Sequence, residues 1–306
     1  MKPIVRALSG HAAVLAAVAF LVAPAPSLIA AQSSAIAIGA EGWFAGMVPP
    51  PGWHLLDYGL YYTADGFNDG NGDEITGEHP LAGFETTIWA DVIRPIYVSN
   101  LKIFGGSQFT HLVLPIVDME IESNVLDDSD TGLADIYFSP FLASWHSQIW
   151  HWAGGLDIIW PTADYDHNDV VHLGNDHITL EPAMAVTGLW PNGWTVSAKV
   201  MYDYHFEHDS IDYTSQQQIH TDFQAGKLLN QQWGVGVNGY WIQGLEDDER
   251  DGKEVPDSQE FAFALGPGVL FKPNAQTALI LKSMFELETE SRPEGVATWL
   301  RLIYSF

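Results

Sequence analysis

The chain has 306 residues, with 12 Lys and Arg against 39 Asp and Glu, a net charge of -27 and 47% hydrophobic residues. This apolar content excludes intrinsic disorder, which combines low hydrophobicity with high net charge. The negative charge excludes a nucleic-acid partner, because such binding depends on Lys and Arg that neutralise phosphates. The sequence has no cysteine, which excludes disulfides, thiolate chemistry and cysteine-bound zinc.

The first residues have the pattern of an export signal. Lys2 and Arg6 precede an apolar stretch from Ala12 to Val22, and small residues before Gln32 offer a cleavage site. The apolar stretch is shorter than the ~20 residues of a transmembrane helix. We therefore predict that residues 1–31 are a signal peptide that is removed. A mature chain without an apolar helix can span a membrane only as a closed β-barrel.

The rest of the chain divides into segments in which apolar and polar side chains alternate, as in strands. These segments are His54–Ala64, Phe84–Val92, Lys102–Leu114, Leu133–Ser144, Trp150–Trp160, His177–Thr187, Trp194–Phe206, Ser215–Lys227, Trp233–Gln243, Gln259–Phe271, Gln276–Glu286 and Val296–Phe306. Their length suits tilted membrane strands of about 10 residues. The pattern predicts an all-β fold, a transmembrane antiparallel β-barrel of about 12 strands over residues 54–306.

The connections alternate in length, which favours a membrane barrel over a soluble sandwich. Long acidic loops such as Asp65–Pro80, Ile116–Thr131 and Ala163–Asp176 alternate with short turns such as Leu189–Gly193. Outer-membrane barrels combine short periplasmic turns with long external loops. Tryptophans such as Trp150 stand beside turns, where aromatic girdles form, whereas the tryptophans of a sandwich core lie in mid-strand.

Residues 32–53 precede the first expected strand and contain several large apolar side chains, namely Trp43, Phe44, Met47 and Trp53. This segment could fold into the lumen as a plug or gate, or extend into the periplasm. We favour the plug, because exposing apolar side chains to water is unfavourable.

Several motifs together resemble a known family. They are Pro49–Trp53, Gly132–Asp135, Gly155–Asp157, Glu181–Pro182 and Gly239–Tyr240. With these motifs the chain resembles the SphA-like family of meta-pathway phenol-degradation proteins. The resemblance implies a barrel in the Gram-negative outer membrane that is linked to uptake of aromatic and other hydrophobic compounds.

The chain ends on an alternating strand whose one face carries Leu300, Leu302, Tyr304 and Phe306. This ending resembles the signal that the barrel-assembly machinery reads, so that machinery is an expected partner. Outer-membrane lipids and lipopolysaccharide are the other expected partners of the barrel surface.

Charged residues on the faces expected to point inward form a candidate constriction: Asp135, Asp157, Glu181, Lys199, Asp203, His205, His220, Lys282 and Arg301. Asp57, Glu85, Asp91 and Asp222 are expected on the same faces. Trp89, Tyr137, Tyr240 and Trp299 are the candidate aromatic permeation path. Such a lumen could select permeants by charge and size. The hypothesis is passive uptake of small hydrophobic or aromatic compounds. The alternative is a sealed-lumen structural or surface-interaction protein in which the polar groups brace the interior.

Asp69, Asn71 and Asp73 have the spacing of calcium ligands. An EF-hand requires Gly and Glu at the positions that Glu74 and Pro80 occupy, so we expect a solvated acidic loop and no metal site. The sequence contains neither Gly-x-Ser-x-Gly nor His-Glu-x-x-His. We therefore predict that the protein is not an enzyme and requires no cofactor.

Overall fold

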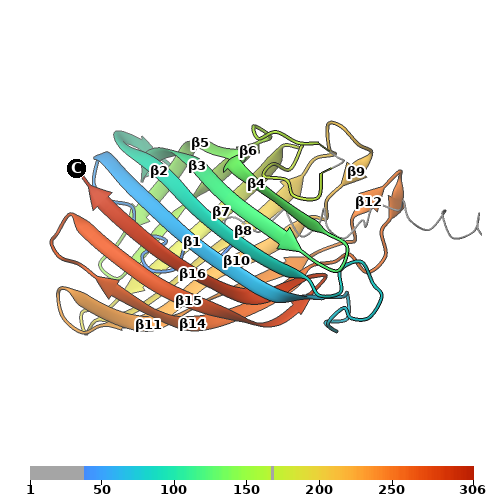
Figure 1. The fold of residues 1–306 in the computed structure, drawn as a ribbon. Helices are drawn as coiled ribbons and strands as arrows, with labels where there is room; N and C mark the ends of the chain where they lie inside the picture. The colour runs from blue at the N-terminus through green and yellow to red at the C-terminus, as the bar shows by residue number, and fades with distance from the viewer. Residues whose placement is uncertain (1–37, 167–168) are drawn as a thin grey trace, which may run out of the picture.

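The structure, a computed structural model, describes residues 38–166 and 169–306 as a closed antiparallel β-barrel (Figure 1). The barrel strands are β1 (Gly52–Asn68), β2 (Glu85–Ile103), β3 (Gly106–Glu122), β5 (Ile136–His146), β6 (Trp150–Trp160), β7 (Thr179–Leu189), β8 (Trp194–His205), β10 (Gln218–Leu228), β11 (Trp233–Gly244), β14 (Phe261–Phe271), β15 (Thr277–Glu290) and β16 (Arg292–Ser305). The pairing of β1 with β16 joins the first barrel strand to the last, and the pairing of β2 with β3 completes the ring. The prediction of a twelve-stranded barrel is confirmed.

Short turns join the strands at the end that carries the C-terminus, and longer loops lie at the other end (Figure 1). Three small strands, β9 (Tyr213–Thr214), β12 (Glu249–Arg250) and β13 (Lys253–Glu254), form a separate sheet among these loops. Among the described residues, no helix has the length and hydrophobicity to cross a bilayer.

One expected loop is wrong over most of its length. The segment Ile116–Thr131 is largely a hairpin, because β3 continues to Glu122 and β4 (Asp127–Leu133) pairs back onto it. The alternation persists there. Val117 and Met119 are buried while the acidic residues between and beyond them face out. Acidic composition therefore marks the part of the strands beyond the apolar surface, as well as the loops.

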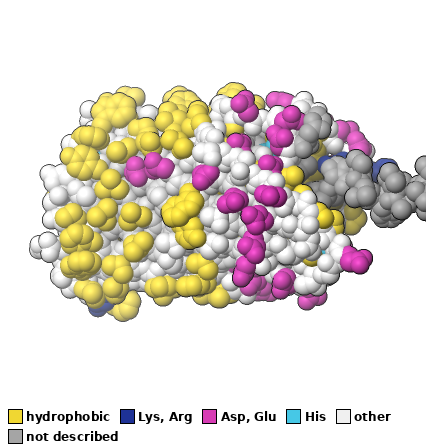
Figure 2. Space-filling model, in the orientation of Figure 1, with side chains coloured by type: hydrophobic (Ala, Val, Ile, Leu, Met, Phe, Trp, Pro, Cys, Tyr) yellow, Lys and Arg dark blue, Asp and Glu magenta, His cyan; other side chains and the backbone are white. Residues whose placement is uncertain are grey.

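The outer surface is divided into an apolar and an acidic half. Hydrophobic side chains gather on the half with the short turns, and Asp and Glu gather toward the loops (Figure 2). Val196 and Val200 on β8 are each 46% exposed, and Trp194 at the start of that strand is 52% exposed. A wide outward-facing apolar band bordered by aromatic rings is the surface of a transmembrane barrel.

The N-terminal segment, residues 38–51, lies inside the barrel (Figure 1). The wall beside it is apolar, because Leu56, Tyr58, Leu60 and Ile88 turn inward and join one buried cluster with Ile38.

This inward apolar face reverses the expected orientation of β1 and β2. Asp57, Glu85 and Asp91 point outward, and so does Trp89, which is 56% exposed. Their assignment to the lumen is wrong. Alternation alone does not show which face of a strand turns inward, and the N-terminal segment in this part of the lumen requires apolar partners.

Candidate functional site

The backbone of the N-terminal segment is fixed to the barrel wall by hydrogen bonds. The Asp222 carboxylate on β10 accepts them from the N–H groups of Gly39, at 2.9 Å, and Glu41, at 2.8 Å. Thr187 on β7 accepts another from the N–H of Gly46, at 3.0 Å. The segment has no secondary structure that would satisfy these donors, so the wall supplies the acceptors.

Trp43 anchors the same segment by packing. Its side chain is 1% exposed and lies against a patch of wall made of Gly226, Gly234 and Gly236. A Cβ atom added to Gly226 would lie 2.7 Å from the indole ring. The absence of side chains at these glycines therefore creates the space that the ring fills. Arg301 on β16 donates a hydrogen bond to the Trp43 carbonyl at 3.2 Å.

Glu41 lies between two arginines from the strands on either side of β1, Arg94 on β2 and Arg301 on β16. Its Oε1 is 2.5 Å from Nη1 of Arg94 on β2, and its Oε2 is 3.0 Å from Nη1 of Arg301. Burial raises the pKa of Glu41, but Arg301 and Arg94 outweigh burial and hold the pKa well below its usual range. The carboxylate is therefore ionised and ties the segment to β2 and β16.

The charged contacts continue from Arg94 across the lumen. Nη2 of Arg94 is 2.9 Å from Nδ1 of His111 on β3, and Nε2 of His111 is 3.0 Å from Oδ1 of Asp157 on β6. Arginine can only donate, so Nδ1 of His111 accepts and its Nε2 carries the proton. Nζ of Lys199 on β8 then lies 4.0 Å from Oδ2 of Asp157 and 3.5 Å from Oε1 of Glu181 on β7.

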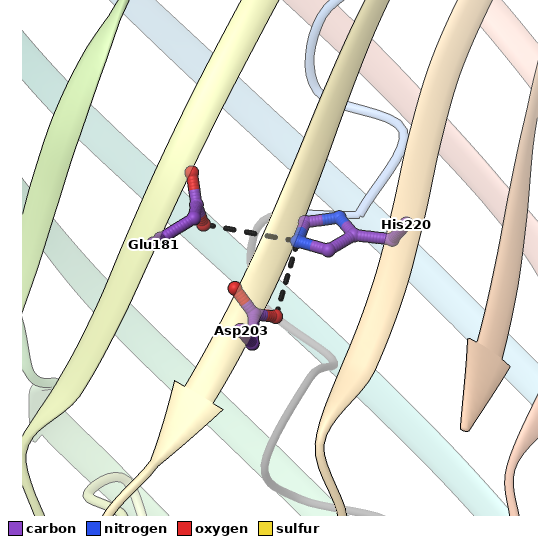
Figure 3. A group of neighbouring side chains, drawn as sticks. All are labelled: Glu181, Asp203 and His220. Atoms are coloured by element: carbon purple, nitrogen blue, oxygen red, sulfur yellow. Dashed lines mark ion pairs between the residues drawn. The ribbon is translucent and has the colours of Figure 1, made fainter. Parts of the chain in front are cut away.

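The chain of contacts ends at His220 on β10, which lies between Glu181 and Asp203 (Figure 3). We call the whole set the lumen network; its members are Glu41, Arg94, His111, Asp157, Glu181, Lys199, Asp203, His220 and Arg301. It links the N-terminal segment to both sides of the barrel and crosses the lumen.

Two cavities lie beside the lumen network. One, of about 80 Å³, is lined by Phe44 and Met47 together with Arg94 and Lys199. The other, of about 60 Å³, is lined by aromatic, aliphatic and charged groups, among them Tyr137, Trp299, Met201, Lys199 and Glu181. Each cavity thus combines apolar walls with hydrogen-bonding groups.

Most of the predicted constriction residues lie in the lumen: Asp157, Glu181, Lys199, Asp203, His220, Lys282 and Arg301. Asp135 does not line the lumen. Its carboxylate accepts hydrogen bonds from the N–H groups of Thr162, Ala163 and Asn175, so it braces a loop. Burial raises the pKa of Asp135.

His205 also belongs to the loop end of the barrel. Its Nδ1 is 3.0 Å from Nε2 of His177, and the ring of His208 lies 4.6 Å from that of His177. Burial lowers the pKa of His177 to about 2 and that of His208 to about 4. These loop histidines are therefore neutral near pH 7 and pack as uncharged rings.

The predicted aromatic path is partly wrong. Tyr137, Tyr240 and Trp299 lie inside, but Trp89 lies outside against Tyr61, with ring centroids 4.3 Å apart.

Of the four expected plug residues, three lie inside the barrel and one lies outside. Trp43, Phe44 and Met47 face interior groups, whereas Trp53 begins the outer face of β1 and is 58% exposed. The predicted signal peptide, residues 1–31, lies outside the described residues.

Sequence reasoning missed Arg94, His111 and Glu41. Arg94 lies two residues beyond Val92, where the predicted strand ended, while β2 continues to Ile103. The small number of basic residues could have pointed to Arg94, because the whole chain has only 12 Lys and Arg and each needs a partner if it is buried.

The residues considered for calcium binding and for the assembly signal lie on the outer surface. Oδ1 of Asp69 accepts hydrogen bonds from the N–H groups of Asn71 and Asp73, forming an exposed turn. Because Oδ1 of Asp69 already accepts these two hydrogen bonds, it is not free to coordinate a calcium ion. The Leu300, Tyr304 and Phe306 side chains are exposed on β16 and after it, and their role as an assembly signal stays a prediction.

Comparisons with known proteins identify a family and a fold. Residues 64–302 match the family described as "Putative MetA-pathway of phenol degradation". No curated protein matches the chain. The structure is similar to that of an outer membrane channel from Pseudomonas putida F1, with 15% identity, a TM-score of 0.76 and coverage of 87% of this chain and 99% of that one.

Two other solved structures have lower similarity. The translocator domain of the autotransporter NalP from Neisseria meningitidis has 8% identity, a TM-score of 0.47 and coverage of 85% of this chain and 90% of that one. A TodX deltaS2S3 mutant monoaromatic hydrocarbon channel has 9% identity, a TM-score of 0.45 and coverage of 88% and 92%. At these identities the likeness concerns the fold alone.

Proposed function

The chain belongs to this phenol-degradation family, and from that premise we propose that it is an outer-membrane channel for passive entry of small aromatic compounds that carry a polar group. The observation that carries the proposal is the mixed lining of the lumen. Tyr137, Trp299 and Met201 line the same cavity as Lys199 and Glu181. A ring would contact the apolar side while its hydroxyl or carboxyl group contacts the charged side.

Weak, divided contacts of this kind suit a channel. Conduction requires binding that is favourable enough for entry and weak enough for release. A purely apolar permeant would leave the charged groups of the lumen network without their partners or water, which is costly. The proposal therefore narrows the earlier hypothesis of hydrophobic or aromatic uptake to aromatic compounds with a polar group.

The N-terminal segment acts as the constriction in this proposal. It carries Glu41 into the lumen network, between Arg94 and Arg301, and Phe44 and Met47 into the wall of one cavity. Displacing the segment would break the ion pairs of Glu41 with Arg94 and Arg301 and would widen the lumen.

Flux into liposomes tests the proposal. Mature protein is reconstituted, and entry of 4-hydroxybenzoate is compared with entry of gluconate, which has the same charge but no ring. We expect faster entry of 4-hydroxybenzoate than in protein-free liposomes, and a smaller effect for gluconate. Equal rates with and without protein for both solutes would favour the sealed-lumen structural protein. Faster entry of both solutes to the same extent would leave a channel without the proposed aromatic preference.

A further inference from the structure

Glu181, Asp203 and His220 meet on the inner wall where β7, β8 and β10 run side by side (Figure 3). The three residues are 4%, 6% and 4% exposed. Nε2 of His220 lies 3.1 Å from Oδ2 of Asp203 and 3.7 Å from Oε2 of Glu181. We propose that these three side chains form a binding site for a divalent transition-metal ion of the zinc class.

The distances fit such an ion. Zinc binds imidazole nitrogen and carboxylate oxygen at about 2.0–2.2 Å, so tetrahedral ligands lie about 3.3 Å from one another. The two separations from His220 Nε2 lie on either side of this value, and all three ligand atoms lie within 4.8 Å of one another.

Polar atoms left without partners around the cluster also point to a shared ion. Nε2 of His220 faces Oδ2 of Asp203 and Oε2 of Glu181. Among the described residues, Oδ1 of Asp203 and Nδ1 of His220 have no hydrogen-bond partner. A metal ion bound by Nε2 and the two carboxylates would hold the three side chains together through ligand types that zinc accepts. It would also satisfy buried polar atoms that are costly to leave unpaired.

Charge favours a cation at this end of the lumen network. The network contains the carboxylates of Glu41, Asp157, Glu181 and Asp203, and the permanent cations Arg94, Lys199 and Arg301. The carboxylates exceed these cations by one charge, which attracts a cation to this end of the network. A proton on His220 would neutralise the excess, and a divalent ion beside a neutral His220 would turn it into a single positive charge. Lys199 contacts Oε1 of Glu181, which leaves Oε2 for the ion.

The donor set selects the class of ion. An imidazole nitrogen favours Zn²⁺ or Co²⁺ over Ca²⁺ and Mg²⁺, which prefer oxygen ligands alone. Glu181 also lines one of the two cavities, so the site borders open space inside the lumen.

Zinc titration of the mature, untagged protein in detergent tests the site. We expect one tightly bound Zn²⁺ per barrel, lost in both the His220→Gln and the Asp203→Asn variants. Heat-modifiable gel migration verifies that each variant is a folded barrel. An unchanged zinc stoichiometry in the folded variants would overturn the proposal.

A surface pair supplies the matched control. Nδ1 of His146 lies 3.1 Å from Nδ1 of His151, and both residues lie away from the lumen network. His146→Gln should retain the bound ion, and its loss there would overturn the proposal. X-ray absorption at the zinc edge of the wild-type protein gives a second measurement that requires no variant. One imidazole with carboxylate oxygens is expected, and two or more imidazoles would contradict the assignment.

Discussion

Arg301 in the last strand and Glu41 in the N-terminal segment form a buried ion pair of 3.0 Å, although they are near opposite ends of the chain. The pair forms only when the barrel has closed, because β16 must lie beside β1 and the segment must be inside. Closure of the barrel and docking of the segment are therefore coupled through one carboxylate.

Glu41→Gln should loosen the N-terminal segment and raise solute flux. The substitution leaves Arg94 and Arg301 without their common partner. Removing one partner of a buried ion pair costs about 3–5 kcal/mol, which here weakens docking of the segment. Liposome flux of the variant is compared with that of Glu254→Gln, which changes an exposed residue of β13 outside the barrel wall. Equal flux in both variants would contradict the assignment of the segment as the constriction.

Trp43→Ala should release the segment without changing any charge. It leaves a cavity against Gly226, Gly234 and Gly236, and loss of a buried tryptophan costs about 3–5 kcal/mol. Hydrogen exchange of the peptide covering residues 38–51 should become much faster, while exchange in the strands stays slow. Unchanged protection of the peptide would show that the indole does not hold the segment.

Trp89→Ala should affect stability but not flux. The indole is on the outer face against Tyr61, so its loss removes an aromatic contact worth about 0.5–1.5 kcal/mol, beyond the area it buries in lipid. The variant should unfold at a lower temperature in detergent and keep the wild-type rate of 4-hydroxybenzoate entry. A changed rate would mean that this face of β2 contributes to the permeation path.

Acid should loosen the loop end of the barrel. Burial lowers the pKa of His177 to about 2 and that of His208 to about 4, below the value of about 6.5 in an unfolded chain. The open loops thus bind protons more readily than the closed ones. Loop stability is greatest above about pH 6.5 and falls as the pH drops toward 4.

Hydrogen exchange of residues 206–217 measures this dependence. After correction for intrinsic rates, exchange should be faster at about pH 5 than at about pH 7.5, and His208→Gln should reduce the difference. Protection that is independent of pH would contradict the packing of neutral histidines.

The strands could be predicted because period-two alternation is a local property of the sequence. The alternation of Trp194 to Phe206 indicated β8 and its lumen residues Lys199 and Asp203 without knowledge of the neighbours. On β2, the same pattern gave the wrong face for Trp89 and Asp91. Which face of β2 turns inward depends on contact with the N-terminal segment inside the barrel. The alternation of apolar and polar residues along β2 does not predict that contact.

The lumen network could be predicted only in part for a related reason. Asp157, Glu181 and Lys199 were placed inward by their strands, but their pairing depends on the register between strands. Glu41 lies in a segment without strand alternation, and Arg94 lies beyond Val92, where the predicted strand ended. Long-range ion pairs become visible only when the closed barrel brings these residues together.

Single-channel recording in planar bilayers tests the proposed channel most directly. Wild-type mature protein should give discrete unitary conductance steps, and Glu41→Gln should give larger steps than Glu254→Gln. If neither the wild-type protein nor the Glu41→Gln variant gives any conductance while both migrate as folded, heat-modifiable barrels, the lumen is sealed and the channel proposal is contradicted.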